Sequence, residues 1–162
     1  MSHWVFNNET YNPDYEEIDW AGFVYRITNN LTDQKYIGRK RFHKKRTLKP
    51  LKGKKRKRIV ITESDWREYL SSCTELIQDI EKHGKENFTF EILSFHENFQ
   101  ELNYAETKLQ ILFAVLESRM PNGDWEYYNN NIENKFYKSE LYTEERSELT
   151  ERFIKNNENL QH

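Results

Sequence analysis

The stretch from Gly22 to Gly38 constrains the fold more than any other part of this 162-residue chain. Residues 23–27 (Phe-Val-Tyr-Arg-Ile) are β-branched and aromatic and alternate with a period of two, which is typical of a strand. A polar turn follows, and a second short strand is expected to end at Gly38. The alternation places Tyr25 and Tyr36 where both can point at one spot, and Gly38 leaves room for a close approach. The stretch therefore predicts a β-hairpin with two converging tyrosines.

The formal net charge of −2 conceals a strong segregation of charge along the chain. Residues 1–21 carry five acidic side chains and no Lys or Arg, whereas residues 39–58 carry thirteen Lys or Arg and no acid. Because these cations repel one another, their density indicates a polyanionic partner, and phosphate groups are the natural one. The pattern favours contact with nucleic acid over the other interpretation of such a run, a nuclear localisation signal.

Composition limits the classes of protein to which the chain can belong. The single cysteine, Cys73, excludes an internal disulfide and a zinc site built on cysteines. The sequence contains no apolar run near the ~18 residues of a membrane span and no signal-peptide core. We therefore expect an intracellular, cytoplasmic protein that makes no membrane contact. The aromatic content of 15% predicts a small core rich in rings.

Periodicity and capping signals predict the remaining elements. We expect three regions, with a central domain between two acidic ends. The basic segment starting at residue 39 can open a helix that Pro50 and Gly53 then break. The expected regions are an acidic aromatic arm (1–20), whose order the sequence leaves open, a domain (21–132) with a basic insertion (39–58), and an acidic helical tail (133–162). After the insertion, the domain is expected to contain a helix that runs from a capping box at 72–75 to Gly84, a strand (88–95), a helix (100–117) capped by Asn98, and an extended segment (125–129).

Glu106 is the acid that stands out on the longest expected helix. At about 100° per residue it lies on the shoulder of the apolar stripe, close to the direction of Phe113. An acid at the edge of a core face either reaches to solvent or is held there for a purpose. The helix alone leaves both interpretations open.

The residues Gly22-Phe23-Val24-Tyr25 and Tyr36-Ile37-Gly38, at this separation, resemble the signature of the GIY-YIG nucleases. The order of elements that follows, ending in a Tyr-Asn pair, is similar to that family over residues 20–132. The segment 80–84 with the following strand resembles the phage-borne homing endonucleases of the family. The resemblance implies an α/β (α+β) fold with a small, mainly antiparallel three-stranded sheet flanked by helices.

The resemblance also implies a catalytic site. Family members place a metal-binding glutamate on the helix after the third strand, which matches Glu106, and the Tyr-Asn pair points to Asn129. Tyr25 is the expected proton acceptor, and Tyr36 is expected to orient water and phosphate. Family spacing points to Arg46 as the arginine that contacts the scissile phosphate, with Arg39 and Arg41 as competitors. Mg²⁺ is the expected cofactor, with Mn²⁺ as a substitute.

The function expected from these residues is that of a metal-dependent DNA endonuclease of homing type that acts on double-stranded DNA. A homodimer is one expected form of the enzyme. Two alternatives stay open: a non-catalytic DNA-binding protein on a nuclease fold, and a structure-specific or RNA-directed nuclease. Besides the catalytic set, the residues expected to contact DNA are Lys40, Arg41, His43, Lys44, Lys45, Lys52, Lys54, Lys55, Arg56, Lys57, Arg58 and Ser72.

Overall fold

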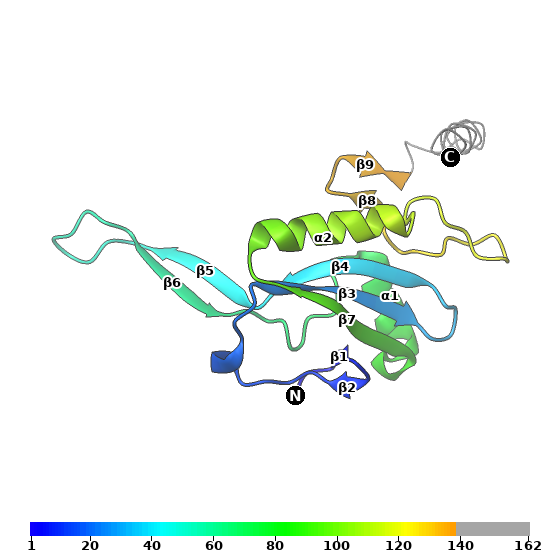
Figure 1. Ribbon diagram of the computed structural model, residues 1–162, viewed down its shortest axis with the longest axis horizontal. Coiled ribbons are helices and arrows are strands. Elements are labelled where there is room, and N and C mark those ends of the chain that lie inside the picture. Colours follow the sequence, from blue (N-terminus) through cyan, green and yellow to red (C-terminus); the bar gives the residue numbers. More distant parts are fainter. Residues whose placement is uncertain (139–162) are drawn as a thin grey trace, which may run out of the picture.

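The computed structural model describes residues 1–138, and three antiparallel strands form its centre (Figure 1). β3 (Gly22–Asn29) lies in the middle, between β4 (Lys35–Arg41) and β7 (Phe88–His96). All but two residues of β3 are buried, because this strand has neighbours on both edges and is covered on both faces. The structure confirms the hairpin and the third strand expected from the sequence.

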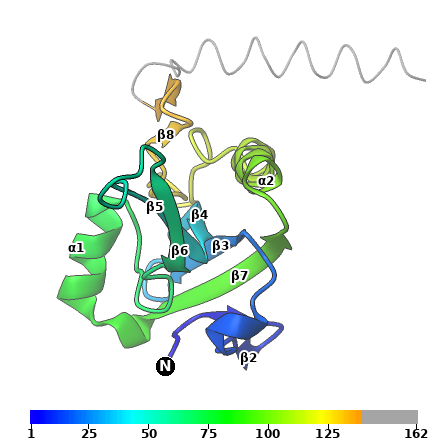
Figure 2. The same cartoon turned by 90° about the vertical axis from the view of Figure 1, so that its left-hand side faces the viewer.

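Two helices cover opposite faces of the sheet (Figure 2). α1 (Thr74–His83) packs Leu76 and Ile80 against the face that carries Tyr25, whereas α2 (Phe99–Leu112) packs Leu102 against the other face. α1 ends where the sequence predicts, at Gly84, whose φ of +85° suits glycine. A 3₁₀ turn, η2 (Lys85–Asn87), then leads into β7. The expected α+β class is confirmed.

The sheet has five strands, so the expected number of three is wrong. The N-terminal arm adds β1 (Val5–Phe6), which pairs parallel to β7, and β2 (Glu9–Thr10), which pairs with β1; η1 (Tyr15–Glu17) follows. Trp4 is fully buried, and its Nε1 donates to the carbonyl oxygen of Trp66 at 2.7 Å. Strands of two residues leave no periodicity in a sequence, and they form here because the buried rings hold the arm on the sheet.

The basic segment forms strands, so the expected helix beginning at residue 39 is wrong. Residues 39–41 extend β4, and the chain continues as a hairpin of β5 (His43–Leu48) and β6 (Arg58–Glu63). On a helix, cations three and four residues apart share a face and repel each other. A strand alternates them between two faces, which separates the charges.

α2 ends at Leu112, five residues before the expected end. The apolar stripe continues in the sequence, but Ala114 has a φ of +47° and reverses the chain, so that Val115 and Leu116 pack on the same core from a turn. A short hairpin of β8 (Asn131–Ile132) and β9 (Phe136–Tyr137) follows. The acidic helical tail expected over residues 133–162 begins with a turn and β9 instead of a helix, and the part from residue 139 onward lies outside the described residues. Neither α1 nor α2 has the length and apolar character that a membrane crossing requires.

His3 makes the attachment of the arm dependent on pH. Its Nδ1 accepts from Lys85 at 2.8 Å, its Nε2 donates to the Tyr69 carbonyl at 3.1 Å, and its ring packs on Phe90. Burial, followed by the charge of Lys85, lowers the pKa of His3 to about 4. Because the folded state favours neutral His3, the contribution of His3 to the free energy of unfolding is fully present above pH 6.5 and is lost as the pH falls toward 4.

We therefore expect the wild type to lose free energy of unfolding more steeply between pH 6.5 and 4 than His3→Gln, which does not titrate. Urea unfolding at several pH values measures the difference between the two proteins. Parallel curves for the two proteins across this range would contradict the assignment.

Candidate active site

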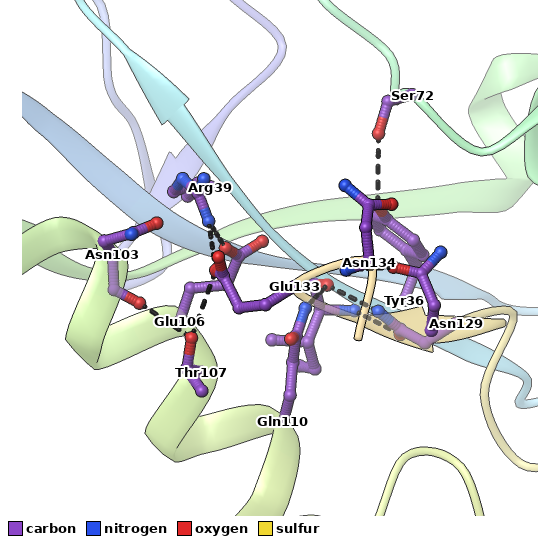
Figure 3. Close-up of polar contacts among 12 residues, drawn as sticks. Tyr36, Arg39, Ser72, Asn103, Glu106, Thr107, Gln110, Asn129, Glu133 and Asn134 are labelled. Carbon is purple, nitrogen blue, oxygen red and sulfur yellow. Dashed lines mark hydrogen bonds and ion pairs between the residues drawn. The ribbon is translucent and has the colours of Figure 1, made fainter. Parts of the chain in front are cut away.

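A cavity of about 800 Å³ opens at the edge of β4 that faces away from β3. It brings together five of the six catalytic residues expected from the sequence, and the sixth, Arg46, lies outside it on β5. Figure 3 shows how side chains from β4, α2 and the segment after residue 128 meet here. The five are Tyr25, Tyr36, Arg39, Glu106 and Asn129.

Gly38 allows the two tyrosines to converge. It pairs with Tyr25 across the strands and lies two residues from Tyr36, so all three share one face of the sheet. A Cβ atom added to Gly38 would lie 2.5 Å from the Tyr25 hydroxyl oxygen and 2.7 Å from Cε1 of Tyr36. The two ring centroids are 6.1 Å apart. The missing side chain at Gly38 is the space that both rings fill.

The two tyrosines differ in their access to solvent. Tyr25 is 1% exposed, and burial, followed by the neighbouring Tyr36 and Tyr69, raises its pKa well above 10. Tyr36 is half-buried, and its hydroxyl lies 3.3 Å from the Ser72 Oγ at the mouth of the cavity. Burial raises the pKa of Tyr36 to about 12, although the hydrogen bond from Ser72 opposes the rise. Of the two tyrosines, Tyr36 is therefore the one whose hydroxyl solvent can reach and whose ionisation is opposed less by burial.

Arg39 joins two carboxylates across the cavity (Figure 3). Its Nη1 donates to Oε2 of Glu106 and, at 2.9 Å, to Oε1 of Glu133. Glu106 is 8% exposed, and burial raises the pKa of its carboxyl, opposed by the Arg39 guanidinium and reinforced by Glu133. The charge on this buried acid therefore depends on Arg39. The interpretation of Glu106 as a solvent-facing residue is wrong.

Asn129 completes the edge of β4. Its Oδ1 accepts from the Ile37 backbone N–H at 3.0 Å, and its Nδ2 donates to the Ile37 carbonyl at 2.8 Å. Gln110 donates to the same carbonyl at 3.1 Å. The side-chain amide of Asn129 thus takes the place of the backbone N–H and C=O groups of a neighbouring strand, which β4 lacks on its outer edge. With both of its polar groups engaged, Asn129 acts as a positioning residue that holds β4 beside the cavity.

Asn129→Asp is expected to lower the free energy of unfolding by about 1–3 kcal/mol, because a carboxylate cannot donate to the buried Ile37 carbonyl. Asn130→Asp is the matched control, since Asn130 is exposed and lines the same cavity. Urea unfolding of both variants checks the prediction. An equal loss in the two variants would show that the backbone contacts of Asn129 carry no special weight.

Residues 4–132 match the sequence model of a protein family described as "Putative endonuclease segE, GIY-YIG domain". The chain belongs to the GIY-YIG endonuclease family. No curated protein and no solved structure matches the chain. The match confirms the resemblance carried by the two half-signatures, and a nuclease domain of this kind implies DNA as the substrate.

The DNA-contacting residues expected from the sequence occupy three places in this GIY-YIG domain: the end of β4, the cavity, and the hairpin of β5 and β6. Lys40 pairs with Asp65 at 2.8 Å and lies over the Tyr69 ring, and Arg41 lies over the Phe99 ring. Ser72 is at the mouth of the cavity. The others lie along the hairpin of β5 and β6 or its connecting loop; they are His43, Lys44, Lys45, Lys52, Lys54, Lys55, Arg56, Lys57 and Arg58.

Glu133 is a site residue that the sequence analysis did not identify. It accepts from Arg39 and, at 3.1 Å, from the Thr107 hydroxyl, although it follows directly after the matched range. Its φ of +52° turns the chain back toward α2. The signal available in the sequence is an acid at the end of an Asn-rich run, and 27 positions separate it from Glu106. Only the fold brings the two carboxylates together.

The oxygen atoms of this site suit the divalent cation that the family implies. Within residues 1–138 no cluster of three or more His, Cys, Asp or Glu side chains could hold an ion. Mg²⁺, however, needs only one or two carboxylates and keeps several waters. One turn before Glu106, the Oδ1 of Asn103 is buried and has no hydrogen-bond partner in the described part of the chain. Glu106, with Glu133 and Asn103 nearby, is a donor set that fits a hard cation.

Proposed function

We propose that this chain is a divalent-metal-dependent endonuclease that hydrolyses phosphodiester bonds of double-stranded DNA. The observation that carries the proposal is the contact of Arg39 with Glu106 in the cavity that also holds Tyr25 and Tyr36. A site for this reaction needs a cation for the phosphate, a carboxylate and a group that accepts the proton of water. This cavity contains all three kinds of group: Arg39 as the cation, Glu106 as a carboxylate and Tyr36 as a proton acceptor.

Arg39 binds the scissile phosphate in this proposal. Its guanidinium is held by Glu106 and Glu133 in the free protein, so its position is set before DNA arrives. A phosphate, like a carboxylate, presents two oxygen atoms that can accept paired hydrogen bonds from a planar guanidinium group, so Arg39 can bind either. Because Arg46 lies on the exposed hairpin, Arg39 replaces it as our candidate for this role.

Tyr36 accepts the proton of the attacking water. Its hydroxyl lies at the cavity beside Ser72 and its side chain is partly exposed, whereas Tyr25 lines the same cavity with a side chain that is only 1% exposed. The sequence analysis gave this role to Tyr25; we assign Tyr25 to holding the ring of Tyr36 in place across Gly38. A pKa of about 12 in the free protein means that the nearby cation and Arg39 must favour the phenolate during the reaction.

Glu106 would hold the metal ion. A bound Mg²⁺ supplies charge that stabilises the phosphate and the leaving oxygen during hydrolysis. Burial of Glu106 raises its pKa, so an ionised Glu106 gains most from a cation at this place. We also propose that the enzyme is of the homing type and that a second copy of the chain makes the second cut of a double-strand break.

Incubation of the purified chain with supercoiled plasmid in Mg²⁺ and in EDTA tests the proposal. We expect open-circular or linear plasmid in Mg²⁺ and Mn²⁺ and none in EDTA. Cleavage in EDTA would contradict the metal requirement, and cleavage of duplex RNA in preference to the plasmid would contradict the substrate. Salt-sensitive DNA binding without cleavage under any of these conditions would indicate a DNA-binding protein on a nuclease fold.

A further inference from the structure

The hairpin of β5 and β6 is a separate two-stranded ribbon that extends away from the sheet and both helices (Figure 1). Every residue from Lys44 to Thr62 except Pro50 is exposed. Six of the thirteen cations of the basic segment lie in the loop at its tip, residues 49–57. An exposed ribbon with two free edges and β-branched side chains is an aggregation hazard unless charge protects it or a partner covers it.

The strand register divides the ribbon into two different faces. Directly opposite residues share a face, and the pairs Lys45–Ile61 and Thr47–Ile59 lie on one side. We call this the apolar face: besides Lys45 and Thr47 it carries Ile59, which is 58% exposed, and Ile61, which is 63% exposed. We call the opposite side the cationic face, which consists of Lys44, Arg46, Leu48, Arg58, Val60 and Thr62.

The root of the ribbon is fixed to the domain. Phe42, between β4 and β5, is fully buried, and its carbonyl accepts from the backbone N–H of Ser64 at 2.8 Å. His43 is held on both sides, because its Nδ1 accepts from the Tyr15 hydroxyl at 2.8 Å and its Nε2 donates to the Trp20 carbonyl at 3.1 Å. These contacts set the direction of the ribbon relative to the cavity.

The dimensions of the ribbon match a groove of duplex DNA. Six paired residues at about 3.4 Å each give a ribbon about 20 Å long, and its strands are about 4.8 Å apart. The major groove of B-DNA is about 12 Å wide and admits a two-stranded ribbon, whereas the minor groove, about 6 Å wide, admits one only when the DNA is deformed. A second copy of this chain is a poor partner for the ribbon, since the two ribbons would bring like charges together.

We propose, on the basis of the proposed DNA endonuclease function, that the ribbon lies in the major groove with its apolar face against the base edges and its cationic face toward the rim. Ile59 and Ile61 then contact thymine methyl groups, which are the apolar features of that groove. Lys44, Arg46 and Arg58 reach sideways from the back of the ribbon to the phosphates on either side. In this arrangement the apolar face sets the sequence preference, and the cationic face supplies affinity that does not depend on sequence.

Two variants of the full chain separate these roles in EDTA, where no cleavage is expected. Ile59→Thr/Ile61→Thr changes the apolar face and keeps β-branched residues, and Lys44→Gln/Arg46→Gln/Arg58→Gln changes the cationic face. All five sites are exposed, and an unchanged thermal midpoint shows that each variant is folded. For each protein, bound duplexes are selected from a random pool and sequenced, and affinity is measured against salt concentration.

We expect the cationic-face variant to bind all duplexes more weakly, with a salt slope reduced by about 2.7, and to keep the wild-type base preference. We expect the apolar-face variant to keep the slope and to lose about 5- to 100-fold of discrimination at one or two positions. Replacing thymine by deoxyuracil in the selected duplex should weaken the wild type more than the apolar-face variant, because the methyl group of threonine keeps only part of the isoleucine contact. A·T and A·U pairs differ only in the major-groove methyl group, so this result locates the contact.

Several results would overturn the inference. These are no base preference in the wild type, a selected site without thymine, loss of preference in the cationic-face variant alone, or tighter binding to duplex RNA. Conversion of a dimer to a monomer by Ile59→Thr/Ile61→Thr, with unchanged base preference, would assign the apolar face to a second copy instead. Failure of the proposed function is a different result, because it would appear as no plasmid cleavage by the wild type in Mg²⁺ whatever the ribbon binds.

Discussion

Replacing Arg39 by alanine is expected to lower the rate of DNA cleavage by about 100- to 1,000-fold at saturating DNA, the cost of losing one well-placed donor to a developing negative charge. Arg39 is the cation in contact with Glu106 in the cavity, and it is oriented by Glu133 as well. Arg39→Lys is expected to recover only part of the rate, because an ammonium group keeps the charge and loses the planar fork. Single-turnover cleavage of a saturating duplex measures the effect.

Arg46→Ala is the matched control for Arg39→Ala. Arg46 is exposed on β5 and lies on the cationic face of the ribbon. Its loss should leave the rate at saturating DNA unchanged and should reduce the salt slope of binding by about 1. The reverse pattern, with Arg46 controlling the rate and Arg39 controlling only affinity, would restore the assignment that family spacing favours and would contradict the site described here.

Gly38→Ala is expected to cost both stability and activity. The new Cβ would lie 2.5 Å from the Tyr25 hydroxyl oxygen and 2.7 Å from the Tyr36 ring. The Tyr25 ring is 1% exposed and packs against the rings of Trp4, Tyr36 and Tyr69, so it can shift only by displacing them. Overpacking of this kind typically costs about 1–3 kcal/mol, and misplacing the reacting groups by about 1 Å can cost about 100-fold in rate. Urea unfolding and single-turnover cleavage measure the two effects.

Gly123→Ala separates the effect of crowding from that of glycine loss in general. Gly123 has a φ of +89° and open space where its Cβ would be. Alanine there should cost about 1 kcal/mol of backbone strain and leave cleavage unchanged. If Gly38→Ala and Gly123→Ala had the same activity, the convergence of the two tyrosines at Gly38 would have no catalytic role.

The elements that could be predicted from the sequence are those whose pattern is local. The period of two in the Tyr25 strand, the apolar spacing of α1 and the glycine after it each specify an element over a few neighbouring residues. The basic segment could not be predicted in this way, because a run of cations shows neither the alternation of a strand nor the apolar spacing of a helix. Its strand form follows from the relief of charge repulsion and from the anchor at Phe42.

The parts of the site that sequence reasoning left open or missed depend on long-range contacts. The spacing of residues points to several arginines, and only the position of Arg39 opposite Glu106 distinguishes them. The Tyr-Asn pair marks Asn129, yet its bonds to both polar groups of Ile37 appear only when the chain returns to the edge of β4. Glu133 joins the site through a turn with positive φ beyond the matched range. Such contacts leave no periodic signal in a sequence.

The most direct test of the account compares cleavage of supercoiled plasmid in Mg²⁺ by the wild type, Glu106→Gln and Asn130→Ala, with binding measured in EDTA. We predict that Glu106→Gln loses cleavage by at least about 100-fold and binds DNA as well as the wild type, and that Asn130→Ala keeps both properties. Glu106 is buried against Arg39, whereas Asn130 is an exposed residue of the same cavity. Full cleavage by a folded Glu106→Gln protein would contradict the placement of the active site at the edge of β4.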